Sequence, residues 1–330
     1  MIAIGPYMLA NDALLAPMAG ITDLPFRRIA RRFGAALATS EMVASGELLT
    51  DRASTRARAE VDDDVALAAV QIAGREPGPM AEAARVATGS GAAIIDLNMG
   101  CPAKKVTSGY SGSALMRDLD HALTLIDAVV AAVDAPVTLK MRLGWDETSL
   151  NAPDLARRAE AAGVAMIAVH GRTRAQFYKG RADWRRVAAV KRAVSVPVVV
   201  NGDVVDEATA REALAQSGAD GVMIGRGAQG APWAPGAIGA TLAGAPPVKP
   251  PRGEALAELI VEHYEAMLSF YGADLGLRVA RKHLSWYLER LPNGGPLRAR
   301  LMRMTDAADV VAAIRGGLAE AEAPPEQAAA

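Results

Sequence analysis

The sequence predicts an α/β protein, a TIM (β/α)8 barrel followed by a small C-terminal helical-bundle domain. Over roughly the first 230 residues, helix-like stretches rich in Ala, Arg and Glu alternate with short runs rich in Val, Ile and Leu, as in parallel α/β sheets. Eight such runs can be counted, the number that closes a (β/α)8 barrel of about 250 residues. Beyond residue 245 the short runs stop, and longer segments carry apolar residues at helical spacing.

Four of the expected strands share one junction, in which a glycine ends a helix and an apolar run starts shortly after it. The junction glycines are Gly34, Gly91, Gly163 and Gly218. Glycine adopts the left-handed conformation that ends many helices without the cost that other residues incur. Two strands follow Pro136 and Pro197, since a proline can open a strand without donating a ladder hydrogen bond. With the runs at 14–18 and 65–73, the expected strands start near residues 14, 36, 66, 93, 136, 165, 197 and 220.

The alternative fold is an open, doubly wound sheet. Such a sheet normally shows a glycine-rich turn, GxGxxG, directly after its first strand. Here the first strand ends in PMAGITD, residues 17–23, which lacks that motif. The sequence therefore favours the barrel over the open sheet.

A proline-rich segment divides the chain. GAPPVKPPRG, residues 244–253, is typical of a stiff linker, and helical spacing of apolar residues resumes on its far side. Three helices are expected there, over 254–272, 273–291 and 296–318, with a PNGGP turn before the third. The expected organisation is a barrel domain, a linker, a helical domain and a disordered tail, over residues 1–243, 244–251, 252–318 and 319–330.

Composition indicates a globular enzyme rather than an exported, membrane or disulfide-stabilised protein. The chain has 330 residues, a net charge of −1 and one cysteine, so a disulfide framework and a Cys-rich zinc site are excluded and a reducing compartment is expected. Its four histidines lack metal-ligand spacing. No apolar run approaches the roughly 18 residues of a membrane helix, and the N-terminus lacks a basic leader. We expect a cytoplasmic monomer with no bound metal and no membrane contact.

Each expected strand is apolar until it ends in a hydrogen-bonding group or a small-residue turn. These endings are Pro17-Met18-Ala19, Glu41, Gln71, Asn98 with Cys101, Lys140 with Arg142, His170 with Arg172, Asn201-Gly202-Asp203 and Gly225-Arg226. In a TIM barrel the carboxyl ends of the strands meet at one rim, where active sites lie. One or two polar endings would be ordinary solubility chemistry, whereas eight on one rim predict a polar-lined pocket.

The last two endings indicate a phosphate site. NGD after the seventh strand and GRG after the eighth bring small residues to the rim position where TIM barrels recurrently bind phosphate. The alternative is that Gly202 and Gly225 only serve tight turns. Lys140 points inward and needs an anionic partner, because a lone buried charge is costly. Flavin mononucleotide (FMN) offers a phosphate and a ring that is negatively charged near N1 when reduced, and Gln71 and His170 suit the polar edge of that ring.

Cys101 follows the fourth strand in a Gly-Cys-Pro setting, at the mouth of the expected pocket. Three roles are open to it: an inert core thiol, a nucleophile or a general acid. The loop setting argues against the first. A nucleophilic thiolate needs an adjacent base, and no histidine is near in sequence, although His170 could lie near in space. A general acid needs only to stay protonated, as a thiol with an unperturbed pKa of about 8.5 does at neutral pH, and we favour that role.

A basic cluster lies in the helical region, where residues 278–303 include seven basic residues and only one acidic residue, Glu289. The basic residues are Arg278, Arg281, Lys282, Arg290, Arg298, Arg300 and Arg303. Because the net charge of the chain is only −1, a role in nucleic-acid binding would need a local patch of this kind. The alternative is an ordinary solvated helix face.

Long blocks of the sequence resemble the tRNA-dihydrouridine synthases. The blocks are LAPMAGITDLPFR, VQIAG, IIDLNMGCPAKKV, GSALMRD, VTLKMRLGWD, VHGRTR, VVVNGDV and DGVMIGRGAQGAPW. They follow one another in consistent order from about residue 4 to 233. The later segment FYG…ARKHLSWYL is similar to the C-terminal helical domain of the bacterial B-type (NifR3-like) subgroup.

The resemblance implies FMN bound on a TIM barrel, reduction of specific tRNA uridines to 5,6-dihydrouridine, and NADPH as the reductant of the flavin. B-type resemblance implies a uridine of the D-loop. Carried over residue by residue, it implies FMN contacts at Pro17, Met18, Ala19, Gln71, Lys140, His170, Asn201, Gly202, Asp203, Gly225 and Arg226. It also implies that Cys101 is the proton donor and that Asn98 lies where the uracil binds.

Reduction of the uracil 5,6 double bond requires a hydride at C6 and a proton at C5. We expect Cys101 to give the proton from the face opposite the flavin. Further substrate contacts are expected at Arg172, Lys104, Lys105, Arg278, Arg281 and Lys282, the two lysines lying in a Gly- and Ser-rich loop that could close over the base. Two alternatives stay open: an FMN oxidoreductase acting on a free pyrimidine, and a non-catalytic RNA-binding regulator.

Overall fold

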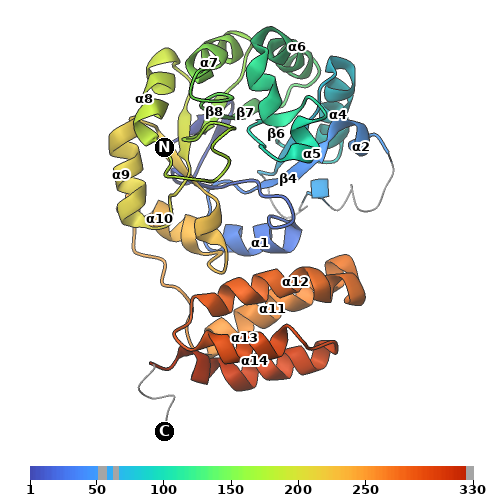
Figure 1. Cartoon of the computed structure of the whole chain (residues 1–330), viewed down its shortest axis with the longest axis vertical. Helices are drawn as coiled ribbons and strands as arrows, with labels where there is room; N and C mark the ends of the chain where they lie inside the picture. Colours follow the sequence, from blue (N-terminus) through green and yellow to red (C-terminus); the bar gives the residue numbers. More distant parts are fainter. Residues whose placement is uncertain (51–57, 62–66, 325–330) are drawn as a thin grey trace. The chain divides into compact units, whose positions relative to one another are not determined.

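The computed structural model describes residues 1–50, 58–61 and 67–324 (Figure 1). The chain forms two compact units. The first comprises residues 1–227 and 234–247, and the second comprises 228–233 and 248–330.

Eight parallel strands form the sheet of the first unit. They are β3 (Ala13–Leu15), β4 (Thr39–Ala44), β5 (Ala69–Ala73), β6 (Ile94–Met99), β7 (Val137–Arg142), β8 (Met166–His170), β9 (Val198–Asn201) and β10 (Gly221–Ile224). Their spatial order is β3-β10-β9-β8-β7-β6-β5-β4. Between the two ends of this order, Leu15 pairs in parallel with Ala38, and the Leu15 N–H donates to the carbonyl of Leu37 at 2.8 Å. The sheet therefore closes on itself, and the predicted TIM-type barrel is confirmed.

Helices follow the strands around the outside of the barrel (Figure 1). They are α1 (Leu24–Arg32), α2 (Ser45–Leu48), α4 (Pro77–Gly89), α5 (Lys104–Thr107), η1 (Gly112–Arg117), α6 (Leu119–Val130), α7 (Ala152–Ala161), α8 (Trp184–Ala193), α9 (Glu207–Ser217), η2 (Arg226–Ala228) and α10 (Ala234–Leu242). The four junction glycines have φ angles of +94°, +95°, +103° and +64° in chain order. Their predicted left-handed conformation is confirmed, and it lets each helix turn back into the next strand.

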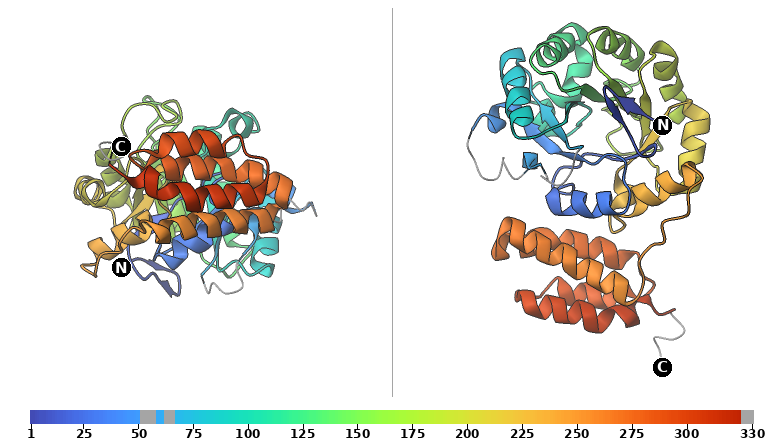
Figure 2. Two further views of the ribbon diagram at one scale, coloured as in Figure 1. Left: turned by 90° about the horizontal axis from the view of Figure 1, so that it is seen from below. Right: turned by 180° about the vertical axis from the view of Figure 1, so that it is seen from behind.

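A short hairpin that the strand pattern did not predict closes the amino-terminal end of the barrel. It consists of β1 (Ala3–Ile4) and β2 (Tyr7–Met8), paired antiparallel. Ile2 and Ile4 are buried in the same apolar cluster as Met166 and Val199, and the view from behind in Figure 2 shows this dark-blue segment across the middle of the barrel. Strands of two residues are too short to show an alternating pattern, so periodicity alone could not reveal them.

The barrel interior changes from apolar to polar along the strands. Near the amino ends the inward side chains are apolar, among them Ile94, Met166 and Val199. Further along the same strand faces lie Asp96, two residues after Ile94, His170, four after Met166, and Asn201, two after Val199, and all three are also buried. Successive residues of a strand alternate between its two faces, so the polar side chains point into the barrel. The carboxyl-terminal end of the interior is therefore a buried polar layer.

The described part of the second unit forms four helices, α11 (Glu254–Tyr271), α12 (Ala273–Glu289), α13 (Gly294–Leu301) and α14 (Ala307–Glu322). Their apolar faces meet in one core that includes Tyr264, Leu284 and Ile314. His263 and His283 are buried in the same unit with ring centroids 4.9 Å apart. Burial lowers the pKa of His263 to about 3 and that of His283 well below its ordinary value, so both side chains are neutral parts of this core.

Two boundaries in this unit differ from the sequence-based expectation. The helix expected over 296–318 is two helices, because Asp306 accepts hydrogen bonds from the N–H groups of Ala308 and Asp309 and caps a new helix. The predicted disordered tail is wrong for residues 319–322, which continue α14 to Glu322. Residues 325–330 of that predicted tail lie outside the described residues.

Candidate active site

The polar strand endings are brought together by the register of the sheet. Asn98 on β6 pairs with Lys140 on β7, Arg142 pairs with His170 on β8, and His170 pairs with Asn201 on β9. Side chains at paired positions of neighbouring strands lie side by side. Residues that are 28 to 42 positions apart in sequence therefore become direct neighbours at one rim, as the sequence predicted.

Lys140 lies in the middle of this polar layer. Its Nζ donates to Oδ1 of Asn201 at 3.1 Å, and Nδ2 of Asn201 donates to the carbonyl of Met223 at 2.8 Å. Burial, and then repulsion by the Arg142 guanidinium, lower the pKa of Lys140 to about 8, against the attraction of Asp96. The ammonium group has three N–H donors, so it can hold an anion while it keeps its bond to Asn201.

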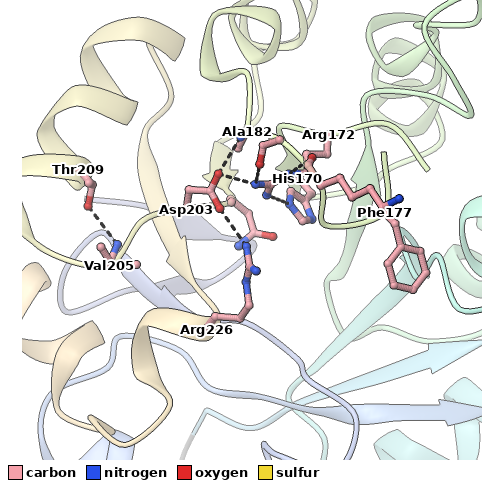
Figure 3. Close-up of polar contacts among 12 residues, drawn as sticks. His170, Arg172, Phe177, Ala182, Asp203, Val205, Thr209 and Arg226 are labelled. Atoms are coloured by element: carbon pink, nitrogen blue, oxygen red, sulfur yellow. Dashed lines mark hydrogen bonds and ion pairs between the residues drawn. The ribbon is translucent and has the colours of Figure 1, made fainter. Parts of the chain in front are cut away.

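Arg172 is the buried hub of the neighbouring group (Figure 3). It is 1% exposed, and its Nη2 donates to Oδ2 of Asp203 and to the carbonyl of Gly180, both at 2.6 Å. Its Nη1 lies 3.2 Å from Nε2 of His170. A guanidinium can only donate, so Nε2 of His170 accepts and the imidazole proton sits on Nδ1. Burial, and then the cationic charges around it, also lower the pKa of His170 well below its ordinary value, so the ring is neutral.

Asp203 adopts a left-handed backbone conformation, with φ +56°. Its carboxylate accepts from Arg172, from Nη2 of Arg226 at 3.0 Å and from the Ala182 N–H at 2.8 Å (Figure 3). Burial by itself raises the pKa of Asp203, but these bonds and the two guanidinium charges outweigh it and the pKa is lowered. The carboxylate thus orients two arginines, and Arg226, the exposed one, is the cation that faces solvent at this rim.

The two glycines of the predicted phosphate site differ in what surrounds them. Gly202 has φ +110°, and a Cβ there would overlap Ala182 and the ring of His170. A Cβ at Gly225 would make only ordinary contacts, 3.6 Å to Sδ of Met18 and 3.7 Å to Cβ of Ala16. The packing of the protein itself therefore requires glycine at Gly202, whereas at Gly225 it leaves room for a methyl group.

Cys101 stands on a loop that is held by hydrogen bonds to its backbone. Its N–H donates to Oδ1 of Asn98 at 2.9 Å, and its carbonyl accepts from the N–H of Ser113 at 3.1 Å and from the Ser113 hydroxyl at 2.8 Å. The residue is half-buried and its thiol is free. These hydrogen bonds use the backbone of Cys101, so the loop is held in place without its sulfur.

Arg142 and Tyr178 were not assigned a role from the sequence. Arg142 is 1% exposed, its Nε donates to the carbonyl of Gly100 at 2.7 Å, and its Nη1 donates to the carbonyls of Thr173 and Phe177. Burial is the main cause that lowers its pKa to about 10, so it remains a cation at neutral pH. It ties the Cys101 loop to the loop after β8, and its guanidinium lies 5.4 Å from the ring of Tyr178. The spacing of Thr138, Lys140 and Arg142 along one strand face was the available signal.

The remaining predicted residues lie around this group. Met18 follows β3, and its N–H donates to the Thr22 hydroxyl at 2.9 Å, which fixes the turn that contains Ala19 and directly follows Pro17. Lys104 and Lys105 are exposed on α5. Arg278, Arg281 and Lys282 belong to α12 of the second unit. Among the described residues, no group of His, Cys, Asp or Glu could hold a metal ion, and no described helix is long and apolar enough to cross a membrane.

Comparisons with known proteins agree with one another. A family model described as dihydrouridine synthase (Dus) matches residues 14–322. The chain is 62% identical over 323 residues to a probable tRNA-dihydrouridine synthase of Rhodobacter capsulatus, covering 98% of this chain and 99% of that protein. It is 45% identical over 319 residues to tRNA-dihydrouridine synthase B of Pseudomonas aeruginosa, covering 97% and 96% respectively.

A solved structure supports the fold alone. The old yellow enzyme homologue from Zymomonas mobilis superimposes with a TM-score of 0.54 at 15% identity, covering 77% of this chain and 94% of that chain. The family assignment therefore rests on the sequence matches, which span nearly the whole chain at identities from 45% to 62%. Together with the family model over residues 14–322, they establish that this chain belongs to the dihydrouridine synthase family.

Proposed function

We propose that the chain reduces specific uridines of tRNA to 5,6-dihydrouridine, with FMN as its bound cofactor and NADPH as the reductant. Membership of the family supports the reaction. The observation that carries the site is the half-buried thiol of Cys101 on a fixed loop beside a buried cation, Lys140, at the carboxyl-terminal rim of the barrel. A uridine of the D-loop is the proposed target.

The residues at the rim fit FMN in charge and in space. The lack of a side chain at Gly225, next to the exposed Arg226 in the chain, suits the close approach of a phosphate. The neutral His170 and the amide of Gln71 offer hydrogen bonds to a polar ring edge, and Lys140 offers a positive charge. FMN held at this rim and reduced by NADPH would supply the hydride for C6 of the uracil.

Cys101 completes the reduction by giving a proton to C5. Its thiol is held on a loop whose backbone is tied to Asn98 and Ser113, so the sulfur can be placed on the side of the base away from the flavin. As C5 takes the proton, the thiol becomes a thiolate, which must regain a proton before the next turnover. A positioned general acid of this kind contributes about 10²–10⁴-fold to a rate.

The exposed cations are the proposed contacts to the tRNA backbone. Lys104 and Lys105 on α5 are exposed at the barrel rim, and Arg278 and Arg303 are exposed on the second unit. Arg281 is different, because its Nη2 donates to the carbonyl of Met304 at 3.1 Å and links α12 to the turn between α13 and α14. We therefore assign Arg281 a structural role beside its proposed contact with tRNA.

The proposed function is tested by mapping dihydrouridine in tRNA from cells that lack the protein and from cells in which it is restored. One or more D-loop uridines should stay unmodified without the protein and regain the modification with it. Purified protein should also act on transcribed tRNA and not on free uridine. Turnover of free uridine alone would support the pyrimidine oxidoreductase instead, and protein without flavin absorbance would support the RNA-binding regulator.

We expect Gly225→Ala to fold normally but to lose at least about tenfold in FMN affinity, because its methyl group fills only the space proposed for the phosphate. Thermal unfolding of the flavin-free protein and flavin titration measure the two effects. Gly202→Ala is the contrasting variant. Its methyl group would overlap Ala182 and His170 at φ +110°, so it should destabilise the flavin-free protein itself. Full FMN affinity in Gly225→Ala would contradict this placement of the phosphate.

FMN affinity should fall as pH rises through about 8, because Lys140 in the free protein has a pKa of about 8. An anionic ligand raises that pKa, so binding takes up a proton above pH 8, and the affinity should decline there by up to about tenfold per pH unit. Flavin fluorescence titrations at a series of pH values measure this slope. In Lys140→Met the affinity should be lower and this component of the slope absent. An identical slope in both proteins would rule out Lys140 as the titrating group.

A further inference from the structure

Asp96 is a buried carboxylate for which neither the sequence nor the proposed chemistry gives a use. It is 4% exposed and lies inside the barrel on β6, between Gln71 on β5 and Thr138 on β7 in the register of the sheet. Its Oδ1 accepts from the Thr138 hydroxyl and its Oδ2 accepts from Nε2 of Gln71, each at 2.6 Å. Both oxygens are therefore engaged by neighbouring strands.

The hydrogen bonds continue from Gln71 to the loop that carries Cys101. Nδ2 of Asn98 donates to Oε1 of Gln71 at 2.7 Å. Oδ1 of Asn98 accepts from the N–H groups of Gly100, at 3.2 Å, and Cys101, at 2.9 Å. An unbroken chain of hydrogen bonds thus leads from Asp96 through two amide side chains to the backbone of Cys101.

The carboxylate of Asp96 fixes which group donates and which accepts in each of these hydrogen bonds. An ionised carboxylate can only accept, so Gln71 must turn its NH2 group to Asp96 and its oxygen to Asn98. Asn98 must then turn its NH2 group to Gln71 and its oxygen to the backbone of the loop. If the amide of Gln71 were reversed, its oxygen would face the carboxylate and its NH2 group would face that of Asn98.

We propose that Asp96 is a positioning residue for Cys101, acting through the amide orientations of Gln71 and Asn98. A stabilising role alone explains the carboxylate poorly, because burying a charge is costly and well-packed apolar residues often serve as well. That cost is visible here, since burial is the largest influence on the carboxyl group and raises the pKa of Asp96 to about 6 despite its hydrogen bonds and Lys140. The expected effect of Asp96 on turnover rests on the proposed function, whereas its expected effect on the Cys101 loop does not.

The loop can be tested directly, because Cys101 is the only cysteine of the chain. The measurement is the rate at which iodoacetamide alkylates the purified, flavin-loaded protein. In Asp96→Ala the amide of Gln71 loses its fixed orientation and the loop is released, so alkylation should be about fivefold faster or more, the effect of losing about one hydrogen bond. Asp96→Asn should restore the wild-type rate, since its oxygen can accept from Gln71 while its NH2 group donates to the Thr138 hydroxyl.

Two further variants keep the test decisive if Asp96→Ala does not fold. Gln71→Met removes the middle of the chain and should give the same increase in alkylation as Asp96→Ala. Thr138→Val removes the other bond to Asp96, which does not lead to Cys101, and should leave the rate unchanged. Equal rates in wild type, Asp96→Ala and Gln71→Met would overturn the proposal, as would an increase in Thr138→Val as large as in Gln71→Met.

Turnover on tRNA provides the second readout. Asp96→Ala should lower kcat about fivefold or more while the KM for tRNA is unchanged, because the exposed cations that contact tRNA are untouched. Asp96→Asn should recover most of kcat. A loss carried only by KM would contradict a role in placing the thiol. If the wild-type protein proved inactive on tRNA, the proposed function would fail, but the alkylation rates would still decide the role of Asp96.

Discussion

Replacing Cys101 by alanine is expected to slow dihydrouridine formation by about 10²–10⁴-fold and to leave bound FMN in place. The substitution should leave the loop in place, because the hydrogen bonds that hold this loop use the backbone N–H and carbonyl of Cys101 and not its sulfur. The loop should therefore keep its place while the proton donor is lost. Single-turnover reduction of transcribed tRNA by the pre-reduced enzyme measures the step directly, separately from cofactor reduction.

Cys101→Ser is the matched control for the shape of the side chain. A hydroxyl is nearly the size of a thiol but is a far weaker acid, so serine should be slow as well if proton donation is the role. Flavin content and the KM for tRNA should match those of the wild type in both variants. An unchanged single-turnover rate in Cys101→Ala would end the proposal that this thiol is the general acid, and a fast serine variant would point to packing instead.

Asp203→Asn is expected to lower the free energy of unfolding by about 3–5 kcal/mol. The side chain of Arg172 is 2% exposed and lies 2.6 Å from the Asp203 carboxylate, so the variant leaves a buried guanidinium without its countercharge. Asparagine is nearly the same size and tolerates the left-handed conformation that Asp203 adopts, with φ +56°. The backbone should therefore not add to the effect. Urea unfolding of the flavin-free protein measures the loss.

Arg226→Leu is the contrasting variant, because Arg226 pairs with the same carboxylate but its side chain is 53% exposed. Its removal should cost less than about 1 kcal/mol of stability. The pKa of Asp203 is lowered in the folded protein, so its stabilising effect is present above the ordinary pKa of an aspartate and is lost as pH falls. The difference between wild type and Asp203→Asn should therefore shrink below about pH 4. Equal losses in Asp203→Asn and Arg226→Leu at neutral pH would contradict the buried-pair explanation.

The fold could be predicted because its signals are local. A glycine ends a helix and a Val- and Ile-rich run follows within a few residues, so Gly34 or Gly218 can be interpreted without knowing what lies around it. The hairpin of β1 and β2 was not predicted because strands of two residues are too short to show an alternating pattern. The break between α13 and α14 was not predicted because apolar spacing continues across it, although Asp306 is a residue type that commonly caps helices.

The sequence could predict that the candidate site residues lie at one rim, but it could not predict the hydrogen bonds and ion pairs between them. Polar strand endings and the family motifs predicted Cys101, Lys140, His170 and the two glycines of the proposed phosphate site. The partners of these residues were hidden, because Arg172 reaches Asp203 across 31 positions and Asn98 reaches Gln71 across 27. Arg142 seemed to be only a polar strand ending, and the structure shows it bound to the carbonyls of two different loops.

The sequence by itself determined which residues would reach the rim of a barrel, since strand length and alternation decide where a side chain points along its own strand. Only the tertiary structure decided which of them are in contact. It shows that Asp96 lies between Gln71 and Thr138, and that Arg172 forms an ion pair with Asp203. The physical reason is that hydrogen bonds and ion pairs act over about 3 Å. At that range the register between strands sets every pairing, and register depends on all eight strands at once.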